Sequence, residues 1–248
     1  IERLITPRTR AILFSNPGNP TGTVYTRAEI EMLVELALEH DLFLIADEVY
    51  REFVYEGRYI PILSFPEVHD RTIMVDSISK RLSACGARIG ALVSKSPEIM
   101  AGAKRCAMAR LSPPTMEQYG LIAFMSHPHR RGIIEGMVEE YRRRRAVLCS
   151  ELKKIPGVVF REPEGAFYVI LGLPVGDAED FVKFMLTDFP GEETVMLAPG
   201  EGFYKTPGLG RDEARIAYVL NCDDLVRACE LLKEGLKLYQ EARAKVRG

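Results

Sequence analysis

Short apolar runs alternate with longer amphipathic segments in the first half of the chain. The runs at 11–15, 42–46 and 72–75 have the length of buried strands, and the segment 26–40 has the period of a helix. This alternation is typical of an α/β domain, in which helices connect the strands of a largely parallel sheet. The sequence therefore predicts an α/β fold with a mostly parallel sheet.

Local signals mark where several of these elements begin. Thr26 is followed three residues later by Glu29, the spacing of a capping box at a helix start. A further strand is expected at 89–93, and helices are expected to begin at Pro97 and at the pair that starts with Pro113.

The second half predicts a smaller α/β unit. A long helix is expected at 130–154, and we place a domain boundary within it. Residues 1–140 would then be part of a large domain, and residues 141–248 a small C-terminal domain. Its expected elements are the strands 158–160, 167–171, 194–197 and 215–219 and the helices 177–188 and 223–244.

Charge and cysteine content limit the class of partner. A net charge of −2 without a dense basic face argues against nucleic acid, and we expect the basic run 142–145 to be a solvated helix face paired with Glu139 and Glu140. Five scattered cysteines without CxxC spacing suggest neither disulfides nor a metal site, which fits a reducing cytoplasm. No run approaches the roughly 18 apolar residues of a membrane helix. A small molecule is the expected ligand.

The most informative polar group follows the strand at 72–75. Ser77, Ser79 and Lys80 come first, and Arg88 follows eight positions after the lysine. Hydroxyls and a guanidinium at a strand's carboxyl end can grip a phosphate, because arginine donates two parallel charge-assisted hydrogen bonds. The lysine amine would lie beside that phosphate. The alternative is an ordinary surface lysine.

Other polar side chains follow neighbouring strands. Asp47 directly follows the apolar run 42–46, and Tyr50 lies three residues further on. An apolar strand ending in Asp-Glu also resembles the Walker B segment of an ATPase, but the chain contains no GxxxxGK[ST] loop. Asn19 lies in a proline- and glycine-rich turn and either faces a ligand or serves its own backbone. Arg215 opens a late strand and either contacts an anionic substrate or forms a surface ion pair.

Together these groups supply an amine, a phosphate clamp, a carboxylate, a phenol, an amide and a second arginine. A lysine that forms a Schiff base with pyridoxal phosphate needs such a set, because the cofactor ring draws electrons only while its nitrogen stays protonated. The chain resembles a class I/II aminotransferase of the fold type I pyridoxal-phosphate enzymes. The motifs that carry the resemblance are, in chain order, NPGNPTG, ADEVY, SISK, GARIG, GAFY and RIAYVLN.

The resemblance implies a role for each matching residue. Lys80 would bind pyridoxal 5'-phosphate covalently and then move a proton between the substrate and the cofactor. Asp47 would pair with the pyridine nitrogen, while Tyr50 and Asn19 would hydrogen-bond the phenolic oxygen and Asn19 would also border the substrate. The phosphate ligands would be Ser77, Ser79 and Arg88.

For the substrate, the resemblance implies that Arg215 binds the α-carboxylate. Arg110 lies where some relatives place an arginine for a dicarboxylic side chain, although a helix-end arginine near the C-terminal dipole explains it equally well. The segment 198–204 resembles bacterial aspartate-type enzymes. The implied reaction moves an amino group from an amino acid, with aspartate favoured, to a 2-oxo acid, with 2-oxoglutarate favoured, by a ping-pong mechanism in a homodimer.

The resemblance leaves three alternatives open. The same scaffold supports carbon–sulfur β-lyases, which release pyruvate and ammonia, and non-catalytic sensing domains of transcription regulators. An ATPase would require a Walker A loop elsewhere. The arm, the early large-domain strands and the glycine- and serine-rich helix start of the family have no counterpart in the sequence, so we expect the chain to correspond to roughly the last two-thirds of such an enzyme.

Overall fold

The computed structural model describes residues 1–247, and side chains as far as residue 244. The chain forms two compact units, and each includes a short segment from the other's part of the sequence. Unit 1 consists of Ile1–Gly18, Thr23–Val138 and Glu164–Ala166, and unit 2 of Asn19–Gly22, Glu139–Pro163 and the chain from Phe167 onward. The domain boundary expected at residue 140 stays a prediction.

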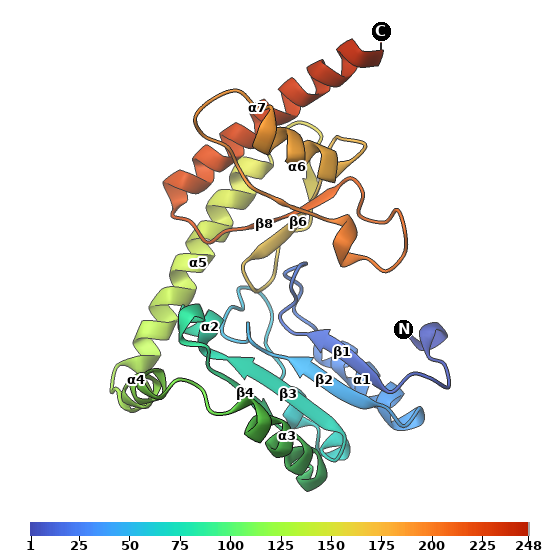
Figure 1. The fold of residues 1–248 in the computed structure, drawn as a ribbon, viewed down its shortest axis with the longest axis vertical. Coiled ribbons are helices and arrows are strands. Elements are labelled where there is room, and N and C mark those ends of the chain that lie inside the picture. Colours follow the sequence, from blue (N-terminus) through green and yellow to red (C-terminus); the bar gives the residue numbers. More distant parts are fainter. Residues whose placement is uncertain (248) are drawn as a thin grey trace. The chain divides into compact units, whose positions relative to one another are not determined.

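Unit 1 is built on a four-stranded sheet (Figure 1). Its strands are β1 (Ala11–Ser15), β2 (Phe43–Asp47), β3 (Thr72–Ser77) and β4 (Gly90–Val93), and they are adjacent in chain order. The first three are parallel, whereas β4 runs antiparallel to β3. The predicted α/β class with a mostly parallel sheet is therefore confirmed.

Helix α1 (Arg27–Glu39) begins at the predicted capping box. The backbone N–H of Glu29 donates to Thr26 Oγ1 at 3.3 Å, and the backbone N–H of Thr26 donates to the Glu29 carboxylate at 2.8 Å. The buried face of α1, which includes Ile30 and Ala37, packs in one cluster with Leu44 of β2. This cluster is the core of unit 1.

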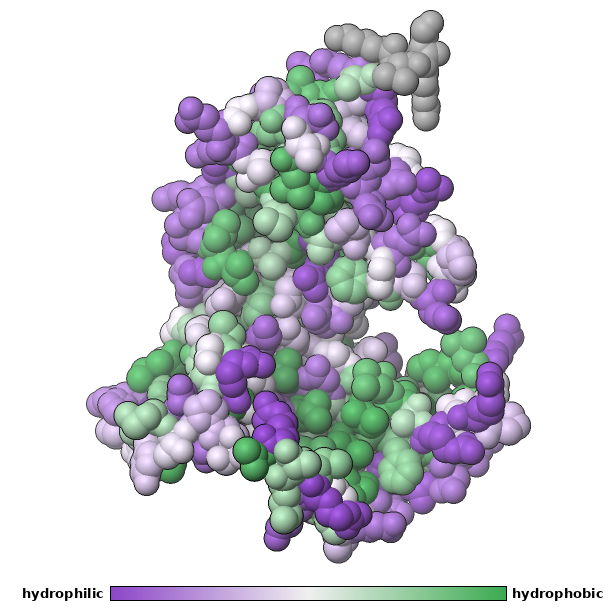
Figure 2. All heavy atoms as spheres, viewed as in Figure 1, coloured by the Kyte–Doolittle hydropathy of each residue, from purple (hydrophilic) through white to green (hydrophobic). Residues whose placement is uncertain are grey.

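The other face of the sheet carries apolar side chains without a covering helix (Figures 1 and 2). Leu13, Ile45 and Ile73 are cross-strand neighbours on this face, as are Val75 and Leu92. Leu13 is 72% exposed and Leu92 is 38% exposed. We call these five residues the open face. It is unusual, because parallel sheets normally have both faces covered.

The remaining elements of unit 1 are four further helices and several single 3₁₀ turns, and only the helices after β4 are long. The helices are α2 (Ile78–Arg81), α3 (Pro97–Arg110), α4 (Thr115–Ser126) and α5 (Arg130–Leu152), the last of which continues into unit 2. Single 3₁₀ turns lie at Glu2–Leu4, Ile62–Ser64, Pro66–Val68 and Cys85–Ala87. Within the described residues, no helix combines the length and the apolarity that crossing a membrane requires.

The described part of unit 2 contains, besides the end of α5, a second four-stranded sheet and two further helices. Its strands are β5 (Val159–Phe160), β6 (Tyr168–Gly172), β7 (Ala198–Pro199) and β8 (Glu213–Ala217), in the antiparallel order β5-β6-β8-β7. The helices are α6 (Ala178–Thr187) and α7 (Cys222–Arg247), and a 3₁₀ turn lies at Glu201–Phe203.

The strand expected at 194–197 is wrong. This stretch has no strand partner, and pairing begins at Ala198, which lies opposite Arg215. Its apolar side chains differ in exposure, as in a strand: Val195 is 8% exposed, whereas Met196 is 76% exposed. The stretch nevertheless does not extend the sheet. Ladder pairing, which local composition does not encode, decides where β7 lies.

The basic run 142–145 is only partly the solvated face that the sequence predicts. Its first three arginines pair with Glu139 or Glu140 at 3.3, 2.9 and 2.8 Å. Arg145 is instead 8% exposed, and its Nε donates to the carbonyl oxygen of Pro163 at 2.5 Å. The fourth arginine is therefore a buried anchor within unit 2.

Candidate functional site

The carboxyl ends of β2 and β3 bring the predicted acid and amine to one edge of the unit 1 sheet. Asp47 is the last residue of β2, and it lies opposite Val75 in the parallel neighbour β3. Helix α2 follows β3 directly and carries Lys80. The ammonium of Lys80 is close enough to lower the pKa of Asp47. The strand ends thus place a carboxylate and an amine within electrostatic range.

The Asp47 carboxyl lies partly out of water. Burial raises its pKa above the usual value and the charge of Asp76 adds to this, whereas the Val49 N–H and the Lys80 ammonium oppose it. The Val49 N–H donates to Asp47 Oδ1 at 3.2 Å, and no described residue donates to Oδ2. A carboxylate in this environment favours a cationic partner.

Tyr50 lies in the turn after β2 and is 3% exposed. Glu48, which the sequence did not single out, is 2% exposed and fixes the following loop. It accepts hydrogen bonds from the backbone N–H of Ile62 at 2.9 Å and from the hydroxyl of Tyr59. Burial raises the pKa of Glu48. The available sequence signal was that Glu48 follows Asp47 in the ADEVY motif. The burial of its side chain, however, depends on tertiary structure.

Ser77, Ser79 and Arg88 line one small hollow of about 270 Å³ in unit 1, together with Gly90 and Arg110. We call it the Arg88 hollow; Ile89 and Pro113 complete its lining. Ser77 Oγ lies 2.8 Å from Ser79 Oγ and 2.9 Å from the Ile89 carbonyl oxygen. The structure thus brings the three predicted phosphate ligands to one hollow, which Arg110 also lines.

The backbone around Arg88 is constrained. Arg88 has φ 54° and ψ 38°, in the left-handed region, and its Nη1 donates to the Cys85 carbonyl oxygen at 2.8 Å. Ser77 pairs with Gly90 in the β3–β4 ladder. A Cβ at position 90 would lie 3.0 Å from the backbone oxygen of Asp76, so a larger residue would crowd this pairing.

The sequence also did not predict an ion-pair cluster that lies beside the site. The side chain of Asp76, 8% exposed, lies 3.0 Å from Arg51 Nη2 and 3.4 Å from Arg81 Nη2. Both arginines also lie 3.8 Å from Glu52. The cluster ties the turn that contains Tyr50 to the end of β3 and to α2. Arg51 and Glu52 are well separated in sequence from Asp76 and Arg81, and the two pairs follow no spacing rule, so only the fold reveals the cluster.

The remaining predicted residues, Asn19 and Arg215, contact each other in unit 2. Arg215 Nη1 donates to Asn19 Oδ1 at 2.8 Å. The guanidinium lies over the rings of Tyr168 and Phe203, with its central carbon 4.5 and 5.1 Å from the ring centroids. Cation–π contacts of this kind hold an arginine in place while leaving its edge available.

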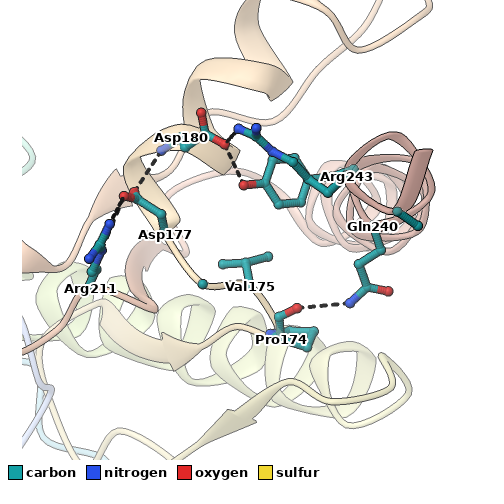
Figure 3. A pocket seen from close by; sticks show the side chains of 10 residues that line it. Pro174, Val175, Asp177, Asp180, Arg211, Gln240 and Arg243 are labelled. Atoms are coloured by element: carbon teal, nitrogen blue, oxygen red, sulfur yellow. Dashed lines mark hydrogen bonds and ion pairs between the residues drawn. The ribbon is translucent and has the colours of Figure 1, made fainter. Parts of the chain in front are cut away.

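A larger hollow of about 620 Å³ in unit 2 is a weaker candidate (Figure 3). Its charged side chains neutralise one another: Arg211 pairs with Asp177 at 3.1 Å, and Arg243 pairs with Asp180. Asp177 also caps α6. In the part of the chain that the structure describes, no group of three or more His, Cys, Asp or Glu side chains is arranged to hold a metal ion.

Comparison with known proteins gives a consistent result. The family model described as "Aminotransferase class I and II" matches residues 1–232. Aspartate aminotransferase of Bacillus subtilis is 31% identical over 242 residues, which cover 94% of this chain and 59% of that relative. Aromatic-amino-acid aminotransferase 2 of Thermococcus litoralis is 30% identical over 243 residues and covers 96% of this chain and 60% of that relative.

Solved structures agree with the sequence matches. Aspartate aminotransferase of Thermus thermophilus with maleate has a TM-score of 0.83 at 30% identity, covering 94% of this chain and 59% of that structure. An aromatic aminotransferase of Pyrococcus horikoshii has a TM-score of 0.85 at 30% identity, covering 96% and 63% respectively. The chain therefore spans about 60% of the length of its relatives. From the motifs, the fold and these matches together, the chain belongs to the class I and II aminotransferase family.

Proposed function

We propose that this chain provides the lysine-bearing and substrate-binding part of a pyridoxal 5'-phosphate-dependent aminotransferase. The observation that supports this most directly is the grouping of Asp47, Lys80 and the Arg88 hollow in unit 1. The proposed reaction moves an amino group from an amino acid to a 2-oxo acid in two half-reactions. A homodimer is part of the proposal through the family resemblance.

The residues present suit this cofactor. The open Oδ2 of Asp47 can accept a bond from a protonated ring nitrogen. The Arg88 hollow offers two guanidinium groups and two hydroxyls, and no carboxylate is among its described lining residues, so it suits a phosphate group. Lys80 has the amine needed for covalent attachment. Acceptor, amine and anion site thus match the chemical groups of one small molecule.

When bound, pyridoxal phosphate supplies an electron-withdrawing ring that stabilises negative charge at the substrate α-carbon. The chain's residues hold and orient the reactants. Lys80 Nζ attaches the cofactor and, when free, takes a proton from and returns a proton to the substrate. Asp47 holds a positive charge opposite its carboxylate, and the Tyr50 hydroxyl donates a hydrogen bond to an oxygen anion.

Arg215 and Asn19 are proposed to bind the substrate. The guanidinium of Arg215 can pair with an α-carboxylate through two parallel bonds, oriented by Tyr168 and Phe203 and by the Asn19 side chain. Asn19 is also proposed to donate to the cofactor's phenolic oxygen. Aspartate and 2-oxoglutarate are the proposed pair, because several relatives are named aspartate aminotransferases, although others are named for aromatic amino acids or alanine.

Covalent labelling tests the proposal. The chain is incubated with pyridoxal 5'-phosphate, reduced with borohydride and digested, and the labelled peptide is mapped by mass spectrometry. We expect the label on Lys80. Lys80→Ala should abolish it and lower amino transfer at least about 100-fold, because attachment point and proton carrier are both lost. Lys104→Ala, an exposed change in α3, is the matched control and should leave labelling unchanged. A label on another lysine would contradict the assignment.

A further inference from the structure

Arg110 is a cation without a counter-ion in the Arg88 hollow. It is the last residue of α3, it is exposed, and its side chain makes no hydrogen bond or ion pair with any described residue. Most other arginines near the sheet edge have partners: Arg51 and Arg81 both pair with Asp76. Arg110 is therefore available for a ligand.

The chain holds Arg110 at this place by an unusual turn. Leu111, the next residue, has φ 71° and ψ 178°, a conformation that is essentially confined to glycine. Its N–H still donates to the Ala107 carbonyl oxygen at 2.9 Å and closes the helix. Gln118 Nε2 then donates to the carbonyl oxygen of Pro113 at 2.8 Å. A strained but fixed turn thus brings the end of α3 to the hollow.

The charge of the hollow is one-sided. Arg88 and Arg110 are the charged groups among its described lining residues, and both are positive. The only hydrogen bond from the Arg88 side chain to a described residue goes to a backbone carbonyl, and the carboxylate of Asp76 is engaged by Arg51 and Arg81. Two arginines that line one hollow without an acid repel each other, and an anion bound in the hollow relieves this repulsion.

We propose that Arg110 is an anion-binding residue that grips, together with Arg88, the phosphate group at this end of the site. This differs from the substrate role expected from the sequence, in which Arg110 contacts the side-chain carboxylate of a dicarboxylic amino acid. The identity of the ligand as the phosphate of pyridoxal phosphate rests on the proposed function. The anion site itself does not, because inorganic phosphate can occupy it.

The test compares wild type, Arg110→Ala, Arg110→Lys and the control Arg105→Ala, which changes an exposed arginine of α3 that does not line the hollow. The affinities for inorganic phosphate, pyridoxal 5'-phosphate and pyridoxal are measured by calorimetry, and folding is checked by circular dichroism. Arg110→Ala should weaken binding of both phosphate compounds about tenfold or more and change pyridoxal binding less than about twofold. Arg110→Lys should lose less, since it keeps the charge but not the planar fork. Arg105→Ala should match wild type.

Several results would overturn the inference. They are unchanged phosphate affinity in Arg110→Ala, an equal loss for pyridoxal, an effect confined to binding of aspartate, or no phosphate binding by wild type. Failure of the proposed function looks different: wild type would bind inorganic phosphate in an Arg110-dependent manner, yet carry no cofactor label on Lys80. That result would leave an anion site and remove the aminotransferase assignment.

Discussion

At the scale of single residues, Asp47 is a carboxylate held where ionisation is unfavourable. Burial raises its pKa in the folded chain. A carboxyl with a raised folded pKa binds its proton more tightly in the folded state, so its contribution to stability is present at low pH and is lost as pH rises through the folded pKa. The ionised Asp47 therefore costs stability at neutral pH.

We expect Asp47→Asn to stabilise the cofactor-free chain at pH 7. The amide has the same shape, keeps an oxygen for the Val49 N–H, and never ionises. The advantage should shrink as pH falls through the folded pKa of Asp47 and disappear below about pH 3, where Asp47 is protonated in both states. Urea unfolding at several pH values measures this. A stability gain that does not depend on pH would contradict the electrostatic cause.

Lys80 supplies the control for this prediction. Its ammonium lowers the pKa of Asp47, so Lys80→Met should raise that pKa further. Asp47→Asn should then stabilise Lys80→Met more than it stabilises wild type. An equal gain in both backgrounds would show that the two side chains do not interact.

At the scale of elements, the Asp76 cluster joins the turn after β2 to β3 and α2. Asp76→Ala would leave Arg51 and Arg81 with only the more distant Glu52. We expect it to lower the free energy of unfolding by about 2 kcal/mol, since the mostly buried partner of two ion pairs is lost. Denaturant unfolding measures the change.

A second observation separates local loosening from general damage. Hydrogen exchange at the amides of Phe53 and Leu82, which lie in the joined turn and after α2, should increase in Asp76→Ala. The matched control is Asp70→Ala, which removes an exposed partner of Arg71 and should change stability little. Equal losses in the two variants would mean that the Asp76 cluster has no special role.

Elements that depend on local signals could be predicted from the sequence. The strand at 11–15 and the capping box at Thr26 match the structure, because apolar runs and cap spacing act over a few residues. The strand expected at 194–197 is wrong because pairing with β8, far along the chain, decides it. Arg145 is buried for a similar reason, since its partner is a distant carbonyl group.

The site follows the same division. Asp47 and Lys80 could be expected at one edge because the carboxyl ends of neighbouring parallel strands meet there. Glu48, Asp76 and the place of Arg110 could not, because each depends on a long-range contact or on an irregular turn. The roles assigned to these residues stay predictions.

At the scale of the whole molecule, the open face of the unit 1 sheet is an exposed apolar surface, whereas the opposite face packs against α1. We expect Leu13→Thr combined with Leu92→Thr to reduce binding of a hydrophobic dye and self-association in sedimentation experiments. Threonine is a β-branched residue that suits a strand, so the free energy of unfolding should change by about 0.5 kcal/mol or less.

The contrasting variant is Leu44→Ala, on the opposite face of the sheet. Leu44 is fully buried against α1, so this change should cost about 2–5 kcal/mol. It should not reduce dye binding by the native chain. If the double threonine variant bound as much dye as wild type, the open face would not be the accessible apolar surface.

The pairing of Ser77 with Gly90 limits how many residues can lie between these two positions. These two residues pair at the ends of β3 and β4, and the connection between them contains both Lys80 and Arg88. The eight-residue separation of the lysine and the arginine is therefore set by the length of the loop between Ser77 and Gly90, and it does not reflect a helical repeat. Inserting one residue between them would leave the ladder intact but displace the guanidinium, whereas inserting one within β4 would turn Leu92 to the opposite face. Insertions and deletions should thus be excluded from this stretch even where single substitutions are tolerated.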